Sequence, residues 1–420
     1  MVVPIHPMDT HSNSLPCITL NRHAQDRAKK RHPWIFSNEL SDPKRFQAYE
    51  PGSLVDVLDH RGTYIGTGFV NPKSLISVRI LSRTRGEEIS GAFFRARLGR
   101  ALDIRDTLYG AGSESQGTYR AVFGEGDGLP GLILDRYQGA WVIEPHALGM
   151  QKRTGLVVEA IQQLARERYN ETDPAIVVRT DHRSAQLEGI EPGSSLVSGS
   201  LKEAFAVEHG LRFPVDPLTG QKTGFFFDQR DNRAFFRRWV EGRARTEKNL
   251  RVLDVFCHAG AWGLGALKAG AAHVTFVDSS AGALDAVRAV AKGLGLENRV
   301  ECVKSDALEA MKAMKAGSFD LVALDPPALV TSKKTAPQGA KAYKDLNAEG
   351  LRITTARGAL STSSCSYHLQ ESSFEEMAQK VLAEGGRDGR VLERGTMSAD
   401  HPVLPAMAEG RYLKNLFIAF

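Results

Sequence analysis

Residues 249–280, NLRVLDVFCHAGAWGLGALKAGAAHVTFVDSS, decide the fold of this chain. An apolar run over Val252–Phe256 leads into a glycine-rich turn at 260–265, and a helix-prone stretch follows. A second apolar run at 273–277 ends at Asp278. The order of strand, loop, helix and strand predicts a βαβ unit. Because the carboxylate lies about 20 residues beyond the loop, it can reach the ribose hydroxyls of a nucleoside bound across that loop.

The loop itself indicates which nucleoside binds. A dinucleotide site needs G-x-G-x-x-G so that the backbone can approach a pyrophosphate. Here Trp262 stands in place of the second glycine between Gly260 and Gly263, which disfavours a nicotinamide dehydrogenase. S-adenosylmethionine carries no phosphate, and Asp254 is a favourable neighbour for its cationic amino-acid tail. The loop therefore favours S-adenosylmethionine as cofactor. The alternative is a plain βαβ unit whose glycines serve packing.

Composition excludes several classes of protein. The 420 residues are 42% hydrophobic and 25% charged, with no apolar run long enough to span a bilayer and no secretory signal at the start. The four cysteines lie far apart, which disfavours a disulfide framework or a zinc site: Cys17, Cys257, Cys302 and Cys365. We expect a cytoplasmic protein of two or three domains, without a membrane segment or a metal.

The positive charge of the chain is concentrated near its N-terminus. The net charge is +5, and residues 1–110 alone hold sixteen Lys and Arg against eleven Asp and Glu. Such a module predicts contact with a nucleic-acid backbone, the alternative being a solvated charged face. The basic residues cluster in 22–32, which contributes Arg27, Lys29, Lys30 and Arg31 as candidate RNA contacts, and recur at Arg79, Arg83, Arg85, Arg95, Arg97 and Arg100.

The pattern along the chain predicts three domains after a flexible tail at 1–16. Short apolar runs broken by Pro and Gly over 17–90 indicate a small β-barrel. Residues 91–200 read as an α+β domain, with helices near 90–109 and 152–168 and strands at 119–123, 131–135, 140–144 and 175–180. From 201 to 420 strands and helices alternate. This alternation predicts an α/β domain with a doubly wound, Rossmann-like sheet of five parallel strands closed by a late hairpin-like pair.

Carboxylates follow the strands of that predicted sheet, where ligands of such sheets gather. Asp278 would hold the ribose hydroxyls, and Asp306 the exocyclic amine of adenine. Asp325, in Asp325-Pro326-Pro327, would lie near the transferred methyl group, and Asp254 falls within the first strand. Each aspartate alone could be a helix cap. A helix is also expected to start near Ser372.

Cys365 decides which kind of methylation is expected. Carbon 5 of a pyrimidine is a poor nucleophile, but a thiolate that adds at carbon 6 makes it able to attack a sulfonium methyl. Methylation of an amine or a ring nitrogen needs no thiol. The surroundings of Cys365 should lower its pKa, and His368 is a candidate partner. The alternative is a buried cysteine that acts as a small hydrophobe.

At several motifs the chain resembles the bacterial PUA-domain family of class I, S-adenosylmethionine-dependent 23S ribosomal RNA (cytosine-C5) methyltransferases. The resemblance covers nearly the whole chain. The motifs that carry it are residues 31–37 (RHPWIFS), 127–132 (DGLPGL), 135–137 (DRY), 220–230 (GQKTGFFFDQR), 325–327 (DPP), 364–366 (SCS) and 400–404 (DHPVL).

The resemblance implies a PUA barrel, a linking α+β domain and a methyltransferase domain that modifies ribosomal RNA; a homodimer is a further expectation. It implies Cys365 as the nucleophile. We expect Asp325 to be the second catalytic residue, which orients the target base that Cys365 attacks. The expected donor-binding residues are Asp254, Phe256, His258, Gly260, Asp278, Ser279, Asp306 and Asp325, and Gln229 and Arg230 join the expected RNA contacts. The chain departs from the family at His258-Ala259-Gly260 and at Ala328-Leu329, and it lacks a second cysteine near Cys365.

Two other functions remain open at this stage. The same scaffold could methylate guanine at N7 or at its exocyclic amine, which would need no thiol. The chain could also be an RNA-binding assembly factor whose enzymatic domain is idle, an alternative that the departures at His258 and Ala328 raise.

Overall fold

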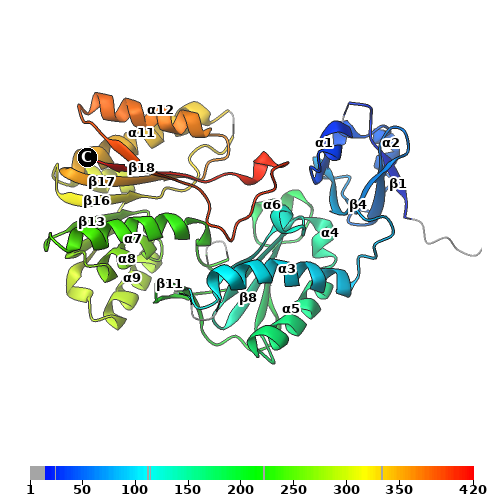
Figure 1. Cartoon of the computed structure of the whole chain (residues 1–420), viewed down its shortest axis with the longest axis horizontal. Coiled ribbons are helices and arrows are strands. Elements are labelled where there is room, and N and C mark those ends of the chain that lie inside the picture. The colour runs from blue at the N-terminus through cyan, green and yellow to red at the C-terminus, as the bar shows by residue number, and fades with distance from the viewer. Residues whose placement is uncertain (1–14, 24, 111–112, 114, 221–222, 333) are drawn as a thin grey trace, which may run out of the picture.

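The computed structural model describes residues 15–23, 25–110, 113, 115–220, 223–332 and 334–420, and the flexible tail expected at 1–16 lies almost wholly outside them. The described chain has three parts, coloured in sequence order in Figure 1: a small N-terminal domain, a central domain and a large C-terminal domain. Each part is built on a sheet of its own. The predicted fold class is confirmed.

The N-terminal domain is a five-stranded sheet with the order β1-β3-β4-β5-β2. Its apolar strand residues, Val55, Val57, Val78 and Ile80 among them, form one core with Leu20. Gly68 allows the sheet to close tightly, because a Cβ there would stand 2.2 Å from the Arg79 carbonyl oxygen. The elements are β1 (Cys17–Thr19), α1 (Gln25–Lys29), β2 (Trp34–Phe36), α2 (Pro43–Phe46), β3 (Leu54–Leu58), β4 (Tyr64–Val70) and β5 (Ile76–Ser82).

The central domain packs two long helices against a five-stranded sheet of order β10-β9-β8-β7-β6. Phe94 and Leu98 of α3 and Val157 and Ile161 of α5 share one buried cluster with the sheet. The arginine-rich helix therefore belongs to this domain rather than to the basic N-terminal one. The elements are α3 (Gly91–Tyr109), β6 (Tyr119–Phe123), β7 (Leu132–Tyr137), β8 (Ala140–Pro145), α4 (Leu148–Gln151), α5 (Thr154–Tyr169), β9 (Ile176–Arg179), α6 (Arg183–Leu187) and β10 (Ser194–Ser198).

A hairpin of β11 (Ala204–Glu208) and β12 (Leu211–Val215) joins the central and C-terminal domains. Phe213 and Phe225 belong to the same core as Tyr137 of the central sheet and Val252 of the next domain. Buried Glu208 receives two hydrogen bonds from Arg233, at 2.6 Å each. This paired charge fixes the segment that leads into the C-terminal domain, because a buried charge is stable only with its partner.

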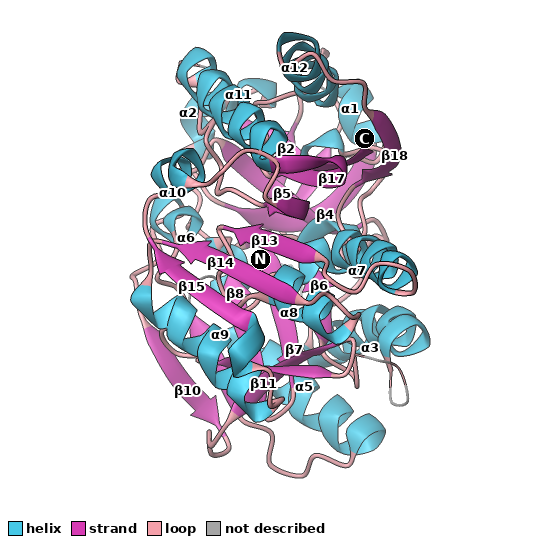
Figure 2. Cartoon of the chain, turned by 90° about the vertical axis from the view of Figure 1, so that its left-hand side faces the viewer, coloured by secondary structure: helices cyan, strands magenta, loops and turns pink. Residues whose placement is uncertain are grey.

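The C-terminal domain is a seven-stranded sheet with the order β15-β14-β13-β16-β17-β19-β18. The first five strands are parallel, and the late pair is antiparallel, with β19 inserted between β17 and β18. Figure 2 shows β13, β14 and β15 running side by side. The elements are α7 (Arg230–Ala244), β13 (Arg251–Val255), α8 (Ala261–Lys268), β14 (His273–Asp278), α9 (Ala281–Gly293), β15 (Val300–Lys304), α10 (Ala307–Ala313), β16 (Phe319–Leu324), α11 (Ala336–Ile353), β17 (Thr354–Ser364), α12 (Glu371–Glu384), β18 (Arg390–Gly395) and β19 (Lys414–Ala419).

Helices cover both faces of this sheet because its strands are apolar on both sides, as expected of parallel strands. Val252 faces the core shared with α8 and α9, whereas its neighbour Leu253 faces the core shared with α10 and α11. The carboxyl ends of the parallel strands therefore form one edge at which loops from both faces meet.

Two details differ from the sequence-based expectations. Helix α12 begins at Glu371 with Gln370 as its cap, so Ser372 lies inside the first turn. Some arginines of the basic N-terminal region bind groups within the protein. Arg79 forms ion pairs with Glu125 and Glu188, and Arg83 donates hydrogen bonds to backbone carbonyls. No helix in the described part of the chain is long and apolar enough to cross a membrane.

Candidate active site

The loop after β13 turns sharply through three residues with left-handed backbone. Phe256 and His258 have φ values of 62° and 47°, and Gly260 has a φ of 75°. The Phe256 N–H donates to the carbonyl of Val277 at 3.0 Å, and the His258 N–H donates to Asp278 Oδ2 at 3.0 Å. The loop is therefore fastened to the neighbouring strand β14, and strained backbone of this kind is characteristic of functional sites.

Asp254 is fully buried at the base of this loop. Its Oδ2 accepts a hydrogen bond from the Gly263 N–H at 2.9 Å, while its Oδ1 has no hydrogen-bond partner among the described residues. Burial raises the pKa of Asp254 to about 8; the Gly263 N–H lowers the pKa, and the charge of Asp325 raises it further. Because a buried carboxylate without a partner is costly, this oxygen is suited to receive a cationic group.

The other predicted donor residues lie along the same edge of the sheet. Asp278 ends β14 and is half-buried, and Ser279 beside it is exposed. Asp306 is exposed and caps α10, where its Oδ1 accepts hydrogen bonds from the Leu308 and Glu309 N–H groups at 2.9 and 3.1 Å. Asp306 is therefore a helix cap, the alternative that its sequence position left open, and its predicted contact with adenine stays a prediction.

Cys365 stands at this same edge, directly after the end of β17. It is half-buried, between the fully buried Ser364 and Ser366, and its Sγ lies 3.9 Å from the carbonyl oxygen of Pro326. The Ser366 Oγ is within 2.9 Å of the Tyr343 hydroxyl and accepts from the Val330 N–H, so the backbone around the thiol is held firmly. The thiol thus faces the Asp-Pro-Pro turn.

Asp325 begins that turn and is held by two side chains. Gln229 Nε2 donates to its Oδ1 at 2.7 Å, and the Trp262 indole N–H donates to its Oδ2 at 3.2 Å. Burial and the charge of Asp228 raise the pKa of Asp325, against the two hydrogen bonds and Arg233, which lower it. A carboxyl group with a raised pKa and fixed orientation is suited to proton exchange with a bound base.

The structure adds two groups near Cys365 that the sequence did not indicate. Lys414 pairs with Ser364 across the antiparallel strands β17 and β19, and its ammonium donates to the Ser366 and Leu369 carbonyls at 2.7 and 2.8 Å. Burial lowers the pKa of Lys414, while negative charge on Cys365 raises it. Tyr412 donates to Asp228 Oδ2 at 2.6 Å. His368, the partner expected from sequence, packs edge-on against the Tyr367 ring.

The buried cysteine of the donor loop differs from Cys365. Cys257 is 4% exposed, and burial raises the pKa of its thiol far above the ordinary value. A thiol in that state is inert because the thiolate is the reactive form. Cys257 is therefore a packing residue of the hydrophobic core, whereas the thiol of Cys365 is partly accessible at the strand ends.

The predicted RNA contacts divide into buried and exposed residues. Gln229 and Arg230 are 2% and 4% exposed, and Arg230 donates to the Thr118 carbonyl at 2.7 Å and lies over the Tyr109 ring. In the described structure both side chains have partners within the protein: Arg230 links its domain to the central one, and Gln229 orients Asp325, while their expected RNA contact stays a prediction. Their polar character alone did not reveal that α7 begins in the interior.

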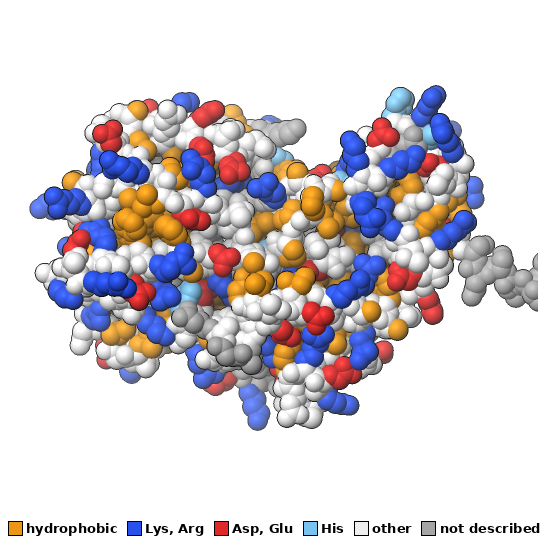
Figure 3. Space-filling model, viewed as in Figure 1, with side chains coloured by type: hydrophobic (Ala, Val, Ile, Leu, Met, Phe, Trp, Pro, Cys, Tyr) orange, Lys and Arg blue, Asp and Glu red, His pale blue; other side chains and the backbone are white. Residues whose placement is uncertain are grey.

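The basic residues of the N-terminal domain are more accessible. Lys29, Lys30 and Arg31 are exposed, and Lys29 forms an ion pair with Asp59 at 3.0 Å. Arg27 is half-buried, with a two-point ion pair to Glu39. Figure 3 shows Lys and Arg side chains gathered on this domain, at the right of the view. Lys30 and Arg31 are the best placed of the four for a phosphate backbone.

Comparison with known proteins adds evidence on the family. Residues 18–83 match a PUA-like domain, and residues 232–351 match a family described as conserved hypothetical protein 95. A ribosomal RNA large subunit methyltransferase I from Klebsiella pneumoniae is 32% identical over 95% of this chain and 97% of its own length. The protein of that name from Escherichia coli is 33% identical over 92% of this chain and 94% of its own length.

The chain belongs to the ribosomal RNA large subunit methyltransferase I family. It is an S-adenosylmethionine-dependent RNA methyltransferase. A solved methyltransferase from Streptococcus mutans has the same fold, with a TM-score of 0.78 over 97% of this chain and 100% of its own, at 18% identity. A second solved structure, of a methyltransferase complexed with SAH, has the same TM-score, identity and coverage.

The residues of the enzyme's sheet edge fit this donor. The unpartnered oxygen of Asp254 suits a cationic group, and Asp278 lies where ribose hydroxyls would be expected. Trp262 fills the place of a phosphate-binding glycine with a buried ring, and its indole N–H is already bonded to Asp325. The loop therefore suits a nucleoside without phosphates, and Asp254, Asp278 and the 256–260 backbone would hold it.

Proposed function

We propose that this enzyme methylates carbon 5 of a cytosine in 23S ribosomal RNA through a covalent adduct with Cys365. The observation that carries the proposal is the half-buried thiol at the strand ends, 3.9 Å from the Pro326 carbonyl and next to the fixed carboxyl group of Asp325. A methyltransferase for a nitrogen atom would need no thiol there. The relatives named above are ribosomal RNA methyltransferases, which supports ribosomal RNA as the substrate.

The thiolate of Cys365 begins the reaction by adding to carbon 6 of the cytosine. The electron pair of the carbon 5–carbon 6 double bond then moves to carbon 5, which becomes nucleophilic. The ammonium of Lys414 lies on the neighbouring strand and favours the thiolate by charge. S-adenosylmethionine, when bound, would supply the methyl group of its sulfonium to carbon 5 and leave as S-adenosylhomocysteine. A general base then takes the carbon 5 proton, and the electron pair of that carbon–hydrogen bond restores the double bond and expels the Cys365 thiolate.

Asp325 orients the base in this proposal. Its two oxygens are fixed by Gln229 and Trp262, so it can direct a proton or a lone pair at one atom. The raised pKa favours the protonated form, which can donate to ring nitrogen 3 of cytosine and stabilise the electrons that addition at carbon 6 displaces. The target base would leave its stack to reach this edge.

The basic N-terminal domain would hold the RNA through phosphates and shape rather than sequence. Lys30 and Arg31 are exposed there. Binding should weaken steeply as salt rises, since each neutralised phosphate releases counterions.

The decisive test compares wild type with Cys365→Ala on RNA that contains 5-fluorocytosine. Fluorine replaces the proton that must leave, so the wild-type adduct should stall and migrate as a protein–RNA band under denaturing conditions. Cys365→Ala should form no band and transfer no methyl group to ordinary RNA, while it binds S-adenosylmethionine with unchanged affinity. Full transfer by Cys365→Ala would refute the covalent route and favour methylation of a guanine nitrogen. Absence of donor binding by wild type would favour an idle RNA-binding factor.

A further inference from the structure

A pocket lies where all three domains meet, beside the catalytic edge but separate from it. Its cavity volume is about 180 Å³, and residues of every domain line it. Trp34 comes from the N-terminal domain, Phe123 and Glu125 from the central domain, and Val403, Met407 and Tyr412 from the C-terminal domain. Figure 3 shows the surface hollowed between the C-terminal and N-terminal domains, with hydrophobic side chains gathered there.

Aromatic rings form much of the pocket wall, and their positions are fixed. The Phe123 ring is 6.4 Å from the Tyr412 ring and 4.9 Å from the His401 ring, centroid to centroid. The Trp34 indole N–H donates to Glu125 Oε1 at 2.6 Å, and Arg79 donates to the same oxygen at 3.0 Å. These contacts span the boundary between two domains, so the wall is built before any ligand arrives.

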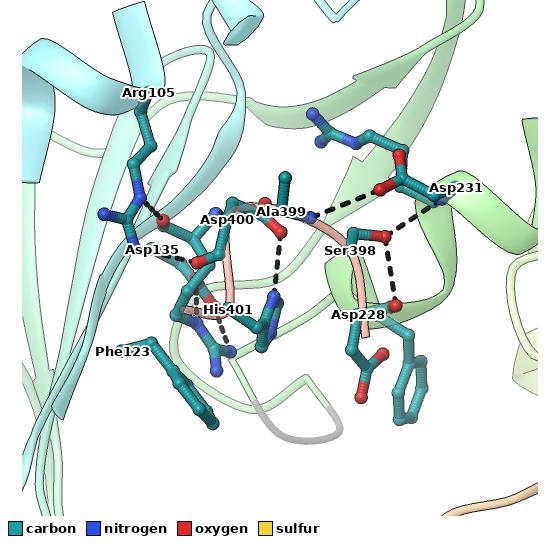
Figure 4. Close-up of polar contacts among 12 residues, drawn as sticks. Arg105, Phe123, Asp135, Asp228, Asp231, Ser398, Ala399, Asp400 and His401 are labelled. Atoms are coloured by element: carbon teal, nitrogen blue, oxygen red, sulfur yellow. Dashed lines mark hydrogen bonds and ion pairs between the residues drawn. The ribbon is translucent and has the colours of Figure 1, made fainter. Parts of the chain in front are cut away.

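A buried polar network anchors the loop that completes the pocket (Figure 4). The Arg120 N–H donates to Asp400 Oδ2 at 3.0 Å, and Arg105 donates to the Asp400 carbonyl at 2.8 Å. The other carboxylate oxygen, Oδ1, lies 2.8 Å from His401 Nδ1. Ser398 donates to the Asp228 carbonyl on the methyltransferase side. The residues that follow, 402–410, are thereby held against the central domain.

Tyr412 connects the pocket with the catalytic groups. Its ring lines the pocket, and its hydroxyl donates to Asp228 at 2.6 Å. The next residue, Gln229, donates to Asp325. Cys365 and Asp325 do not line the pocket. A group bound there would therefore be a neighbour of the reacting base rather than the reacting base itself.

The size and chemistry of the pocket suit one ring system. Its volume is below the roughly 300–1,000 Å³ of pockets that enclose drug-sized ligands, and corresponds to about six water molecules. Aromatic side chains stack on any base, since every base has a π-face. Glu125 and Glu409 also line the cavity, and carboxylates accept hydrogen bonds from amino groups. Arg79 forms an ion pair with Glu125, and His32 Nε2 lies 3.3 Å from Glu409 Oε2, so both carboxylates also have partners within the protein.

We propose that this three-domain pocket receives a second unstacked base of the substrate RNA, one that carries an amino group and lies next to the target nucleotide. The proposal rests on the proposed function for RNA as the substrate. It gives the N-terminal domain a direct role at the active site through Trp34, beyond attraction of phosphates. It also explains why the Asp-His-Pro segment is anchored so firmly, since that segment forms one wall.

The test uses two variants that alter the pocket and one matched control. Val403→Trp fills the cavity, and Phe123→Leu removes a stacking ring. Val197→Trp makes the same change as the first variant at a position that is 46% exposed on the edge strand β10. Binding of fluorescently labelled r(A)12, r(C)12 and r(U)12 is measured by anisotropy at one fixed salt concentration, with S-adenosylmethionine affinity as the check on folding.

Both pocket variants should bind r(A)12 and r(C)12 about 5- to 150-fold more weakly than wild type, the range that corresponds to loss of one stacked base. Val197→Trp should bind as wild type does. Pocket variants that bind both RNAs as tightly as Val197→Trp would overturn the proposal, and an equal loss for r(U)12 would overturn the selection of an amino group. Methyl transfer by wild type is assayed separately. Lack of transfer to cytosine would refute the proposed function and leave the pocket result standing.

Discussion

Replacement of Asp254 by asparagine should change how the stability of the ligand-free enzyme depends on pH. The carboxylate is fully buried, its Oδ1 lacks a partner among the described residues, and its pKa is raised to about 8. Asparagine has nearly the same shape and keeps an oxygen that can accept from the Gly263 N–H. The substitution therefore removes the titrating charge with little change in packing.

The sign of the effect follows from the direction of the shift. In the unfolded chain an aspartate has a pKa of about 3.9, so between about pH 4 and 8 only the folded state keeps the proton. The free energy of unfolding of wild type should then fall as pH rises, by at most about 1.4 kcal/mol per pH unit for one proton. Relative to the Asp254→Asn variant, wild type should lose about 2.5 kcal/mol between pH 5 and pH 7.

Urea unfolding of both proteins at pH 5, 6 and 7 measures this difference. Asp306→Asn provides the control, because it replaces an exposed helix cap by another residue that caps well. Parallel pH profiles for wild type and Asp254→Asn would refute the reasoning. The same reasoning predicts that S-adenosylmethionine binding to wild type tightens by up to about tenfold per pH unit over this range, since a cationic ligand favours the ionised carboxylate. The variant should show a flat profile in calorimetry.

Three further substitutions test the surroundings of the site. Trp262→Phe removes a hydrogen-bond donor to Asp325, so the pKa of this carboxyl group should rise further and the alkaline limb of the kcat profile should move to higher pH. Asp400→Ala breaks a buried charged network and should lower the free energy of unfolding by roughly 3 kcal/mol or more at pH 7, as chemical denaturation would show. Gly126→Ala places a methyl group 1.9 Å from the Pro402 carbonyl oxygen, so it should displace the pocket loop and weaken RNA binding while donor affinity, measured by titration, stays unchanged. Equal RNA affinity in this variant would contradict the anchoring role.

Local patterns in the sequence were sufficient to predict the sheet and its strand ends. The apolar runs at 252–256 and 273–277 are short and end at turns, a pattern that predicts strands. Both runs form strands in the structure, and Asp254 and Asp278 therefore lie beside the loop as expected. Cys365 was likewise placed correctly at an edge, since it follows a strand. The reactivity of the Cys365 thiol could not be predicted from the sequence.

The features of the site that the sequence did not predict depend on contacts between residues far apart in the chain. Lys414 comes opposite Ser364, the residue before Cys365, only because β19 pairs antiparallel with β17, a pairing that no local pattern encodes. Gln229 and Arg230 were expected to contact RNA because they lie in the 220–230 motif that carries the resemblance. Their hydrogen bonds instead go to Asp325 and Thr118, about one hundred residues away in either direction, inside the protein. Burial of a polar side chain is a tertiary property that composition does not reveal.

The position of β19 between β17 and the edge strand β18 has a consequence for synthesis of the protein. Chains emerge from the ribosome N-terminus first, and domains fold in that order. The N-terminal and central domains can be complete while β17 is paired only with β16, because β19 follows β17 in the chain after α12 and β18. Lys414 comes opposite Ser364, next to Cys365, only after β19 has been synthesised and has paired with β17. The proposed catalytic edge is therefore completed later than the N-terminal domain that we propose holds the RNA, and removal of β19 should abolish turnover.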